Sequence, residues 1–359
     1  MYNYIILTST AITSCINFVL QYHNMNLTSR IDGLTLLGKA LNSLPQEKKL
    51  LWFDKAGNEN RWFTPESIEM AIKGIAKMLK KEALEEWVTP YSLKNKDKGI
   101  GVIMAGNIPL VGFHDLLSVL ISGNIAKIKL SSQDKVLMPL VTEMLISIEP
   151  QFEHQIEYIS KLENIDAVIA TGSDNSARYF KQYFGKKPHI IRKNRTSCAV
   201  LTGKETNDEI VALGKDIFSY FGLGCRNVSK LYVPKGYDFA YFLDLMSEFE
   251  EIGNHSKWVN NYDYTKSIYL VNREPHLDTG FLLLRESKEM VSPLAVLYYE
   301  EYDNINSLFN LLADKKDKLQ CIISNGDAIV SFLKFGEAQY PDVTDYADGV
   351  DTLKFLEQL

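Results

Sequence analysis

The sequence predicts an α/β protein made of two doubly wound domains, each a parallel sheet covered by helices. The chain has 359 residues, which is too long for one small core and suits two domains of ordinary size. Its content of 46% hydrophobic and 23% charged residues is typical of a soluble globular enzyme. From Lys98 onward, short apolar runs alternate with segments of helical periodicity, which is the pattern of a parallel sheet with crossover helices.

A helix is expected to begin at residues 64–66, Thr-Pro-Glu. The threonine is a capping residue, the proline suits the first turn, and the glutamate lies near the positive end of the helix. Ile68, Ile72, Ile75 and Leu79 then recur at helical spacing. This spacing predicts one buried face opposite a lysine-rich face in water.

Two sets of strands and helices follow. In the first set we expect strands at 101–105, 125–130 and 167–170 and helices at 113–121, 136–148 and 175–183. In the second set we expect strands at 198–201, 229–233 and 267–271 and helices at 208–221 and 239–251. The basic stretch 186–195 is taken as the seam between the sets. The expected division is an amino-terminal extension of uncertain role at 1–24, domains at 25–195 and 196–340, and a C-terminal tail at 341–359.

Charge and cysteine content argue against several classes of function. The net charge of −6 does not suit nucleic acid as the main partner. Cys15, Cys198, Cys225 and Cys321 lie far apart and show no metal-ligand spacing, and the six histidines are scattered. This pattern fits a reducing, cytoplasmic compartment and gives no support for a metal site. Residues 4–20 are apolar, but too short and too polar for a confident membrane span, and no basic signal-peptide start precedes them.

Residues 221–229, Phe-Gly-Leu-Gly-Cys-Arg-Asn-Val-Ser, are the most informative stretch of the chain. Gly222 and Gly224 allow a tight turn and a close approach to a ligand, because glycine adopts positive φ without a Cβ penalty. Cys225 follows, with Arg226 beside it, and nearby positive charge or backbone amides make a thiolate a better nucleophile. A lone cysteine is more often a buried structural residue, but such a residue does not need these glycines. We therefore predict that Cys225 is a nucleophile.

A phosphate-binding turn is a weaker prediction. No Gly-x-Gly-x-x-Gly follows a predicted strand, so the usual dinucleotide fingerprint is missing. Thr171, Gly172 and Ser173 do follow a predicted strand and precede a helix, whose first N–H groups can bind phosphate. An ordinary strand-to-helix turn explains these three residues equally well.

Several further motifs occur in one order along the chain. They are Gly-Asn-Ile-Pro-Leu at 106–110, Gly-Asn at 123–124, Lys-Ile-Lys at 127–129 with Ser131, Thr-Gly-Ser at 171–173, the cysteine run at 221–229, and Glu-Met-Val-Ser-Pro at 289–293. Over roughly residues 95–300 the chain resembles the aldehyde dehydrogenase superfamily, and the cysteine run points to its branch of LuxC-like long-chain fatty acyl-CoA reductases. Ser292 stands where the superfamily pattern has glycine. The resemblance implies an aldehyde dehydrogenase-like fold, with a nicotinamide cofactor domain at 25–195 and a catalytic domain at 196–340.

The resemblance also implies a role for each matched residue. Asn107 would donate its side-chain amide to a developing oxyanion, together with the backbone N–H of Cys225; a turn asparagine is the alternative. Cofactor binding is implied for Lys129, Ser131, Thr171, Gly172, Ser173 and Glu289. In this set Lys129 would contact the adenosine ribose or its phosphate, 171–173 would lie near the pyrophosphate, and Glu289 would hold the nicotinamide ribose. A strand-end lysine and a surface glutamate remain the alternatives for Lys129 and Glu289.

One departure from the superfamily bears on the reaction. Hydrolytic aldehyde dehydrogenases carry a glutamate before the strand expected at 198–201, and aligning the two patterns places Ile191 at that position. A general base that activates water is therefore not evident, whereas acyl transfer between thiols does not need one.

The expected function is NADPH-dependent reduction of a long-chain fatty acyl thioester to the aldehyde through an acyl-cysteine, with NADH a less favoured cofactor. The expected partners are acyl-CoA or an acyl-protein thioester, an acyl-transferring protein, and further copies of the chain in a homo-oligomer. Two alternatives stay open. One is a short-chain acylating aldehyde dehydrogenase or acyl-phosphate reductase, and the other is a catalytically silent acyl-binding subunit.

Overall fold

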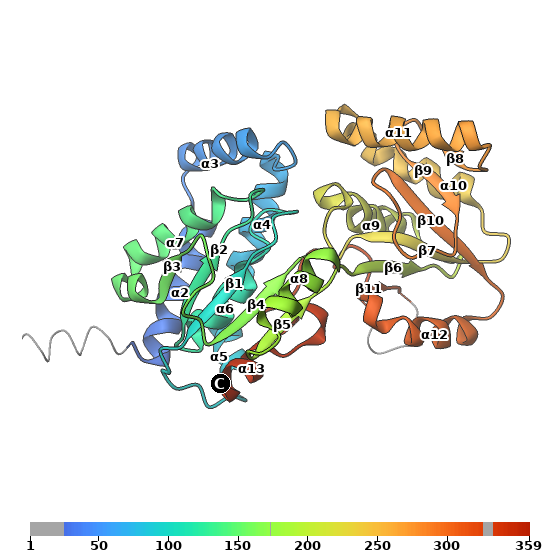
Figure 1. Cartoon of the computed structure of the whole chain (residues 1–359). Coiled ribbons are helices and arrows are strands. Elements are labelled where there is room, and N and C mark those ends of the chain that lie inside the picture. Colours follow the sequence, from blue (N-terminus) through green and yellow to red (C-terminus); the bar gives the residue numbers. More distant parts are fainter. Residues whose placement is uncertain (1–24, 173, 326–332) are drawn as a thin grey trace, which may run out of the picture.

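The computed structural model describes residues 25–172, 174–325 and 333–359. Figure 1 shows two lobes side by side, each built around a sheet. The extension expected at 1–24, which includes Cys15, and the predicted cofactor residue Ser173 lie outside the described residues.

Among the described residues, four helices open the first lobe. They are α2 (Leu27–Asn42), α3 (Gln46–Glu59), α4 (Pro65–Met78) and α5 (Lys81–Val88). As predicted, α4 begins behind Thr64, whose side chain accepts a hydrogen bond from the N–H of Ser67. Ile68, Ile72 and Ile75 are buried, so the helical spacing identified the core-facing side correctly.

A parallel sheet of five strands, in the order β3-β2-β1-β4-β5, forms the centre of the first lobe. Its strands are β1 (Gly99–Ile103), β2 (Ile125–Lys129), β3 (Ile156–Tyr158), β4 (Ala167–Thr171) and β5 (His189–Arg192). The connecting helices are α6 (Phe113–Ile121), α7 (Leu137–Ile148), the short η1 (Pro150–Gln155) and α8 (Asp174–Phe184). The six predicted elements of the first set all form near their expected bounds. The chain runs from β1 outward to β3 and then returns to the other side of β1, so the strand order reverses between β1 and β4.

The second lobe holds a six-stranded sheet in the order β11-β6-β7-β10-β9-β8. Its strands are β6 (Thr196–Val200), β7 (Val228–Pro234), β8 (Leu277–Asp278), β9 (Leu283–Glu286), β10 (Val296–Tyr302) and β11 (Leu319–Ile323). The sheet is parallel except for β8, which pairs antiparallel with β9. Its helices are α9 (Asn207–Phe218), η2 (Ser219–Gly222), α10 (Phe239–Met246), η3 (Ser247–Asn254), α11 (Ser256–Asn272), α12 (Ile305–Asp314) and η4 (Lys316–Lys318). Within the described residues, no helix combines the length and the apolar character needed to cross a membrane.

The strand predicted at 267–271 is wrong, because these residues lie in α11. β-branched and aromatic residues favour a strand when a short window is considered alone. Over the whole segment, however, Trp258, Tyr262, Thr265 and Tyr269 are buried at intervals of three and four residues. That spacing belongs to one face of a helix, and the tertiary packing of that face decides the structure.

The basic stretch taken as the seam is partly a strand. His189–Arg192 form β5, and the Nη1 of Arg192 donates to both carboxylate oxygens of Asp115 at 2.7 and 2.6 Å in the interior. The link between the two sheets is therefore only residues 193–195. The helices predicted at 208–221 and 239–251 end earlier, at the bounds of α9 and α10, and continue as the 3₁₀ turns η2 and η3.

The C-terminal residues return to the first lobe (Figure 1). After the turn η5 (Ala347–Gly349), α13 (Thr352–Gln358) places Leu353 and Leu356 in the hydrophobic core of the first lobe. The segment expected as a tail thus completes a core, and the chain passes between the lobes twice.

Candidate active site

The loop that carries Cys225 has an unusual backbone. It joins η2 to β7, and three successive residues before it, Tyr220, Phe221 and Gly222, have positive φ of 51°, 56° and 69°. Glycine adopts this conformation freely, but tyrosine and phenylalanine do so only where their surroundings hold them. At Gly224 the requirement is for space, since a Cβ there would lie 2.9 Å from the side-chain oxygen of Asn227. Cys225 itself is exposed.

Two buried side chains hold this loop, and sequence reasoning assigned no role to either. The amide of Asn227 accepts a hydrogen bond from the N–H of Gly224 at 2.8 Å and donates to the carbonyls of Asp216 and Ser219 at 3.1 and 2.7 Å. The hydroxyl of Ser197, in β6, donates to the Cys225 carbonyl at 3.0 Å. The presence of Asn227 within the cysteine run was the available signal. Nothing near Ser197 in the sequence points to the loop.

The surroundings of Cys225 favour the neutral thiol. Although the residue reaches solvent, the protein atoms around its sulfur desolvate the thiolate and raise the pKa of the thiol to about 11. Cys321 adds to this effect, and Arg226 opposes it. Cys198 and Cys321 are buried, and desolvation raises their pKa as well. Of these three described cysteines, Cys225 alone is exposed.

Arg226 is bound to a segment that leads back to the first lobe. Its Nε donates to the carbonyl of Ala338 at 2.6 Å, and its guanidinium lies 3.8 Å from the carboxylate of Asp345. The buried carboxylate of Asp216 fixes that segment by accepting from the N–H groups of Gly336 and Ala338 at 2.6 and 3.0 Å. Burial raises the pKa of Asp216 to about 6. Arg226 therefore anchors the loop as well as influencing the thiol.

Asn107 reaches the cysteine loop from the other lobe. It lies in the loop between β1 and α6, and its Nδ2 donates to the carbonyl of Leu223 at 2.7 Å. The Asn107 loop is fixed by the buried carboxylate of Asp134, which accepts from the N–H of Leu110 at 3.0 Å. Asn107 therefore lies against the loop that carries Cys225, at the junction of the lobes. Because an amide nitrogen carries two hydrogens, Asn107 keeps one donor for a ligand.

Most predicted cofactor residues lie at the carboxyl edge of the first sheet. Ile103, at the end of β1, pairs with Lys129 in β2 on one side and with Ala170 in β4 on the other. The ends of these three strands therefore bring Lys129 and Ser131, the Asn107 loop, and Thr171 with Gly172 to one edge. Ser131 lies directly against Gly106, where a Cβ would come within 2.6 Å of its hydroxyl. Lys129 is exposed.

Glu289 is less closely tied to this arrangement. It is exposed on the connection between β9 and β10. The next residue, Met290, accepts a hydrogen bond from the hydroxyl of Ser229 at the start of β7, at 2.8 Å. In the described part of the chain, no hydrogen bond or ion pair joins the Glu289 carboxylate to another predicted site residue.

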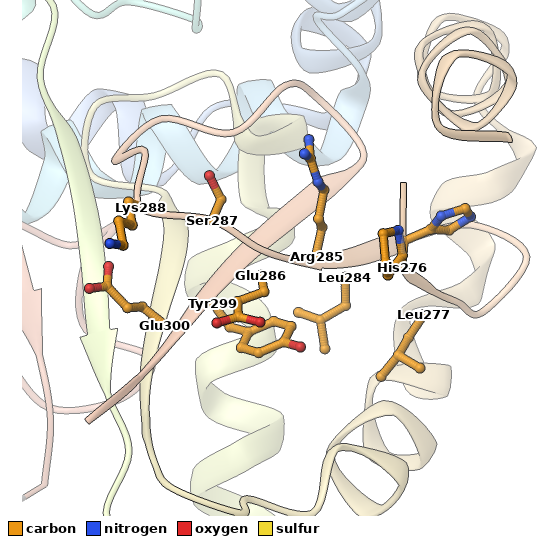
Figure 2. Close-up of a pocket in the computed structure, with 10 residues that line it drawn as sticks. His276, Leu277, Leu284, Arg285, Glu286, Ser287, Lys288, Tyr299 and Glu300 are labelled. Carbon is orange, nitrogen blue, oxygen red and sulfur yellow. The ribbon is translucent and has the colours of Figure 1, made fainter. Parts of the chain in front are cut away.

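A separate cavity of about 510 Å³ lies at the far edge of the second sheet (Figure 2). It is lined by Pro275, His276, Leu277, Leu284, Arg285, Glu286, Ser287, Lys288, Tyr299 and Glu300. Its lining includes none of the predicted site residues. The chemistry of Cys225 places the candidate active site at the lobe junction instead.

The architecture and the cysteine site define an aldehyde dehydrogenase fold. An aldehyde dehydrogenase from Bacillus cereus in complex with NAD+ is 12% identical, covers 85% of this chain and 73% of its own, and superposes with a TM-score of 0.60. P. syringae AldA, an indole-3-acetaldehyde dehydrogenase, is 13% identical, covers 85% of this chain and 73% of its own, and has a TM-score of 0.64. An NADP-dependent enzyme of E. coli is 11% identical, covers 85% of this chain and 74% of its own, and has a TM-score of 0.62. At these identities the likeness shows the fold alone.

The sequence identifies the family within that fold. The model of the acyl-CoA reductase (LuxC) family matches residues 45–242, more than half of the chain. The chain therefore belongs to the acyl-CoA reductase (LuxC) family, and it is an oxidoreductase of the acyl-CoA and aldehyde type. No curated protein matches it in sequence.

Proposed function

We propose that this protein reduces an acyl thioester to the aldehyde through an acyl-enzyme on Cys225. The observation that carries the proposal is the meeting of Asn107 and the cysteine loop across the two lobes, through the 2.7 Å hydrogen bond to Leu223. The exposed thiol can be reached by a substrate, and the amide of Asn107 is bound to the loop that carries the thiol. The first lobe is proposed as the cofactor domain and the second as the catalytic domain.

The carboxyl edge of the first sheet fits a dinucleotide. In open α/β sheets, ligands bind outside the strand ends where the strand order reverses, which here is between β1 and β4. Gly106 and Gly172 keep the backbone near these ends free of side chains. The structural neighbours from Bacillus cereus and E. coli are described as an NAD+ complex and an NADP-dependent enzyme. When bound here, the cofactor would supply the hydride; we propose NADPH, with the exposed ammonium of Lys129 contacting the 2′-phosphate.

The residues of the chain perform acyl transfer as follows. The Cys225 thiolate attacks the thioester carbonyl, and the resulting oxyanion accepts hydrogen bonds from the free Nδ2–H of Asn107 and the N–H of Cys225. The bond to the leaving thiol breaks, and that thiol takes up the proton that Cys225 lost. After reduction of the acyl group, the same two donors stabilise the thiohemiacetal oxyanion on Cys225. Its collapse breaks the carbon–sulfur bond, and it releases the aldehyde and the Cys225 thiolate.

Hydrolysis of the acyl-enzyme is disfavoured by the groups around β5. Ile191 occupies the position at which the hydrolytic enzymes carry a water-activating glutamate, and the carboxylate of Asp115 is bound to Arg192, the next residue. We propose a long-chain fatty acyl group, on the strength of the cysteine run. Acyl-CoA or an acyl-protein thioester would donate it, and the active form would be a cytoplasmic homo-oligomer.

Intact-mass measurement on the wild type, Cys225→Ala and Cys321→Ser tests this proposal. Each protein is incubated with acyl-CoA of increasing chain length in the absence of reduced cofactor. We expect one added acyl mass on the wild type and on Cys321→Ser, none on Cys225→Ala, slow loss in buffer and fast loss after addition of a thiol. The absence of any adduct on the wild type would favour a silent acyl-binding subunit. Rapid release of free acid in buffer would contradict the reductase assignment, and a preference for short chains would favour the short-chain alternative.

A further inference from the structure

Three aromatic rings meet where the lobes join: one from the first lobe and two from the second, of which one lies four residues before Cys225 in the sequence. We call Trp62, Phe221 and His255 the junction cluster. The ring of Trp62 stacks on His255 with a centroid distance of 5.0 Å and lies 5.2 Å from Phe221, and the Phe221 and His255 rings are 4.4 Å apart. Trp62 comes from the first lobe and packs against the hydrophobic cores of both lobes. The cluster therefore connects the first lobe to the segment that precedes Cys225.

Contacts within the first lobe hold the backbone of Trp62 in place. Its backbone N–H donates to the side-chain oxygen of the buried Asn60 at 3.1 Å, and the Asn60 amide donates to the Gln133 carbonyl at 3.2 Å. Gln133 belongs to the loop of Ser131 and Asp134, which supports the Asn107 loop. The positions of Trp62 and Asn107 are thus set by one connected group of loops.

His255 attaches the cluster from the opposite side. Its Nε2–H donates to the backbone carbonyl of Arg61 at 2.8 Å, so the ring that stacks on Trp62 is also hydrogen-bonded to the residue beside it. The ammonium of Lys257 lies 5.5 Å from the centre of the Trp62 ring. Phe221 therefore packs against two rings that are themselves held in place.

The backbone at Phe221 needs such support. Tyr220 and Phe221 both adopt the left-handed conformation, with ψ of 27° and 31°. Side chains with a Cβ rarely occupy this region, and they remain there only when surrounding contacts over-determine the backbone. Two residues further on, the carbonyl of Leu223 accepts the hydrogen bond from Asn107. The orientation of that carbonyl, and of the N–H of Cys225 after it, depends on the same strained segment.

We propose that Trp62 is a positioning residue for acyl transfer, which holds residues 220–222 so that Cys225 and Asn107 stay in register across the lobe junction. The inference rests on the proposed role of Cys225 as nucleophile. Trp62 makes no bond to the reacting atoms and acts through Phe221. A shift of either lobe that moved Trp62 away from Phe221 would relax the cysteine loop. Acyl transfer therefore requires the arrangement of the lobes in which Trp62 packs on Phe221.

The inference predicts opposite changes in two reactions of the same sulfur. Acyl transfer from a bound thioester needs aligned donors, and so it should slow when the loop relaxes. Alkylation by iodoacetamide needs only an accessible thiolate, and so it should become faster as the thiol gains water. The charged and titratable groups that act on the Cys225 thiol are Cys321, Arg226 and Asp348. All three are unchanged in a Trp62 variant.

The experiment compares the wild type with Trp62→Ala, Trp62→Phe and Tyr264→Ala. Tyr264 is an aromatic residue of α11 that is 70% exposed, and it serves as a matched control. For Trp62→Ala we expect acyl transfer to fall at least about tenfold, and alkylation at neutral pH to rise about tenfold, which corresponds to a thiol pKa lower by roughly one unit. Trp62→Phe keeps a ring against Phe221 and should stay within about threefold of the wild type. Tyr264→Ala should change neither rate.

Cys198 and Cys321 provide an internal control, because they are buried. If Cys198 and Cys321 also react in Trp62→Ala, that variant has lost its fold as a whole. His255→Leu, which removes one ring and the hydrogen bond to Arg61, then takes its place, and we again expect slower acyl transfer and faster alkylation. An equal rate of Cys225 alkylation in the wild type and in Trp62→Ala, or parallel loss of both reactions in a folded Trp62→Ala protein, would overturn the inference. Failure of the wild type to form an acyl-enzyme would instead contradict the proposed function, since alkylation does not depend on the substrate.

Discussion

The two loops that meet at the candidate active site are held in different ways. The Asn107 loop contains one non-glycine residue at positive φ, Leu110, whose N–H is bound by the carboxylate of Asp134 within the same lobe. The cysteine loop follows a turn, η2, that contains two such residues, Tyr220 and Phe221, and contacts from both lobes support the loop and this turn. The Asn107 loop is thus held by a contact within one lobe, whereas the cysteine loop is held by Asn227 and Ser197 of its own lobe and also by contacts from the first lobe. We infer that the arrangement of the lobes affects the position of the thiol more than it affects the Asn107 loop.

The largest expected effect sharpens the cysteine half of this comparison. Because desolvation raises the pKa of the Cys225 thiol to about 11, the reactive thiolate is a minor form at neutral pH. Alkylation of Cys225 should therefore rise about tenfold per pH unit below that pKa, or roughly a thousandfold between pH 7 and 10. Mass spectrometry of the labelled peptide in Cys321→Ser and wild-type protein measures this dependence. A plateau beginning near pH 8 would mean that the free thiol is not desolvated.

Asn107→Ala tests the other half of the comparison. Loss of an oxyanion donor typically slows catalysis by about 10²–10³-fold, and we expect an effect of this size on aldehyde formation. The fold should be retained, since the Asp134 contact that holds the loop does not involve Asn107. Steady-state kinetics with circular dichroism make the measurement, and Asn58→Ala, an exposed asparagine of α3, is the control. Unchanged aldehyde formation in Asn107→Ala would assign Asn107 to loop anchoring alone.

Lys129→Ala tests the cofactor edge beside the Asn107 loop. If its ammonium contacts the 2′-phosphate, the variant should raise the KM for NADPH by about ten- to a hundred-fold, as expected for a lost charge-assisted hydrogen bond of about 1.5–3 kcal/mol, with a small change for NADH. Lys135→Ala, an exposed lysine of the next loop, provides the matched comparison. Equal changes for both cofactors would remove the proposed contact with the 2′-phosphate.

The smallest expected effect compares the two buried side chains that hold the loops. Asn227→Asp keeps the acceptor for Gly224 but loses the donors to Asp216 and Ser219, whereas Asp134→Asn keeps one acceptor for Leu110. We expect each to lower the free energy of unfolding by about 1–3 kcal/mol, as measured by urea denaturation. Acyl transfer should fall further in Asn227→Asp, because its loop carries the thiol. A larger loss of activity in Asp134→Asn would reverse our ranking of the two loops.

Much of the fold could be predicted from local patterns. The cap at Thr64 and the isoleucine spacing behind it located α4, and the alternation after Lys98 located β1, β2 and β4 of the first sheet but neither of its edge strands, β3 and β5. The pattern failed at 267–271, because β-branched residues have the same local preference whether a strand or a helix face buries them. The sequence indicated Lys129, Ser131 and Thr171 only as members of separate motifs, and it did not show that they lie at one edge of the sheet. Its assembly depends on which strands pair with β1.

By itself the sequence determined the chemistry that this protein can offer: a cysteine preceded by two glycines, an amide in an Asn-x-Pro loop, and the family to which these motifs belong. These are properties of residue type and short spacing, which need no knowledge of distant contacts. Only the tertiary structure decided that Asn107 reaches Leu223, that Arg226 is turned towards Ala338, and that Trp62 packs on Phe221. Each of these pairs joins residues more than a hundred positions apart. Such contacts arise from strand pairing and from the packing of one lobe against the other, which no local pattern encodes.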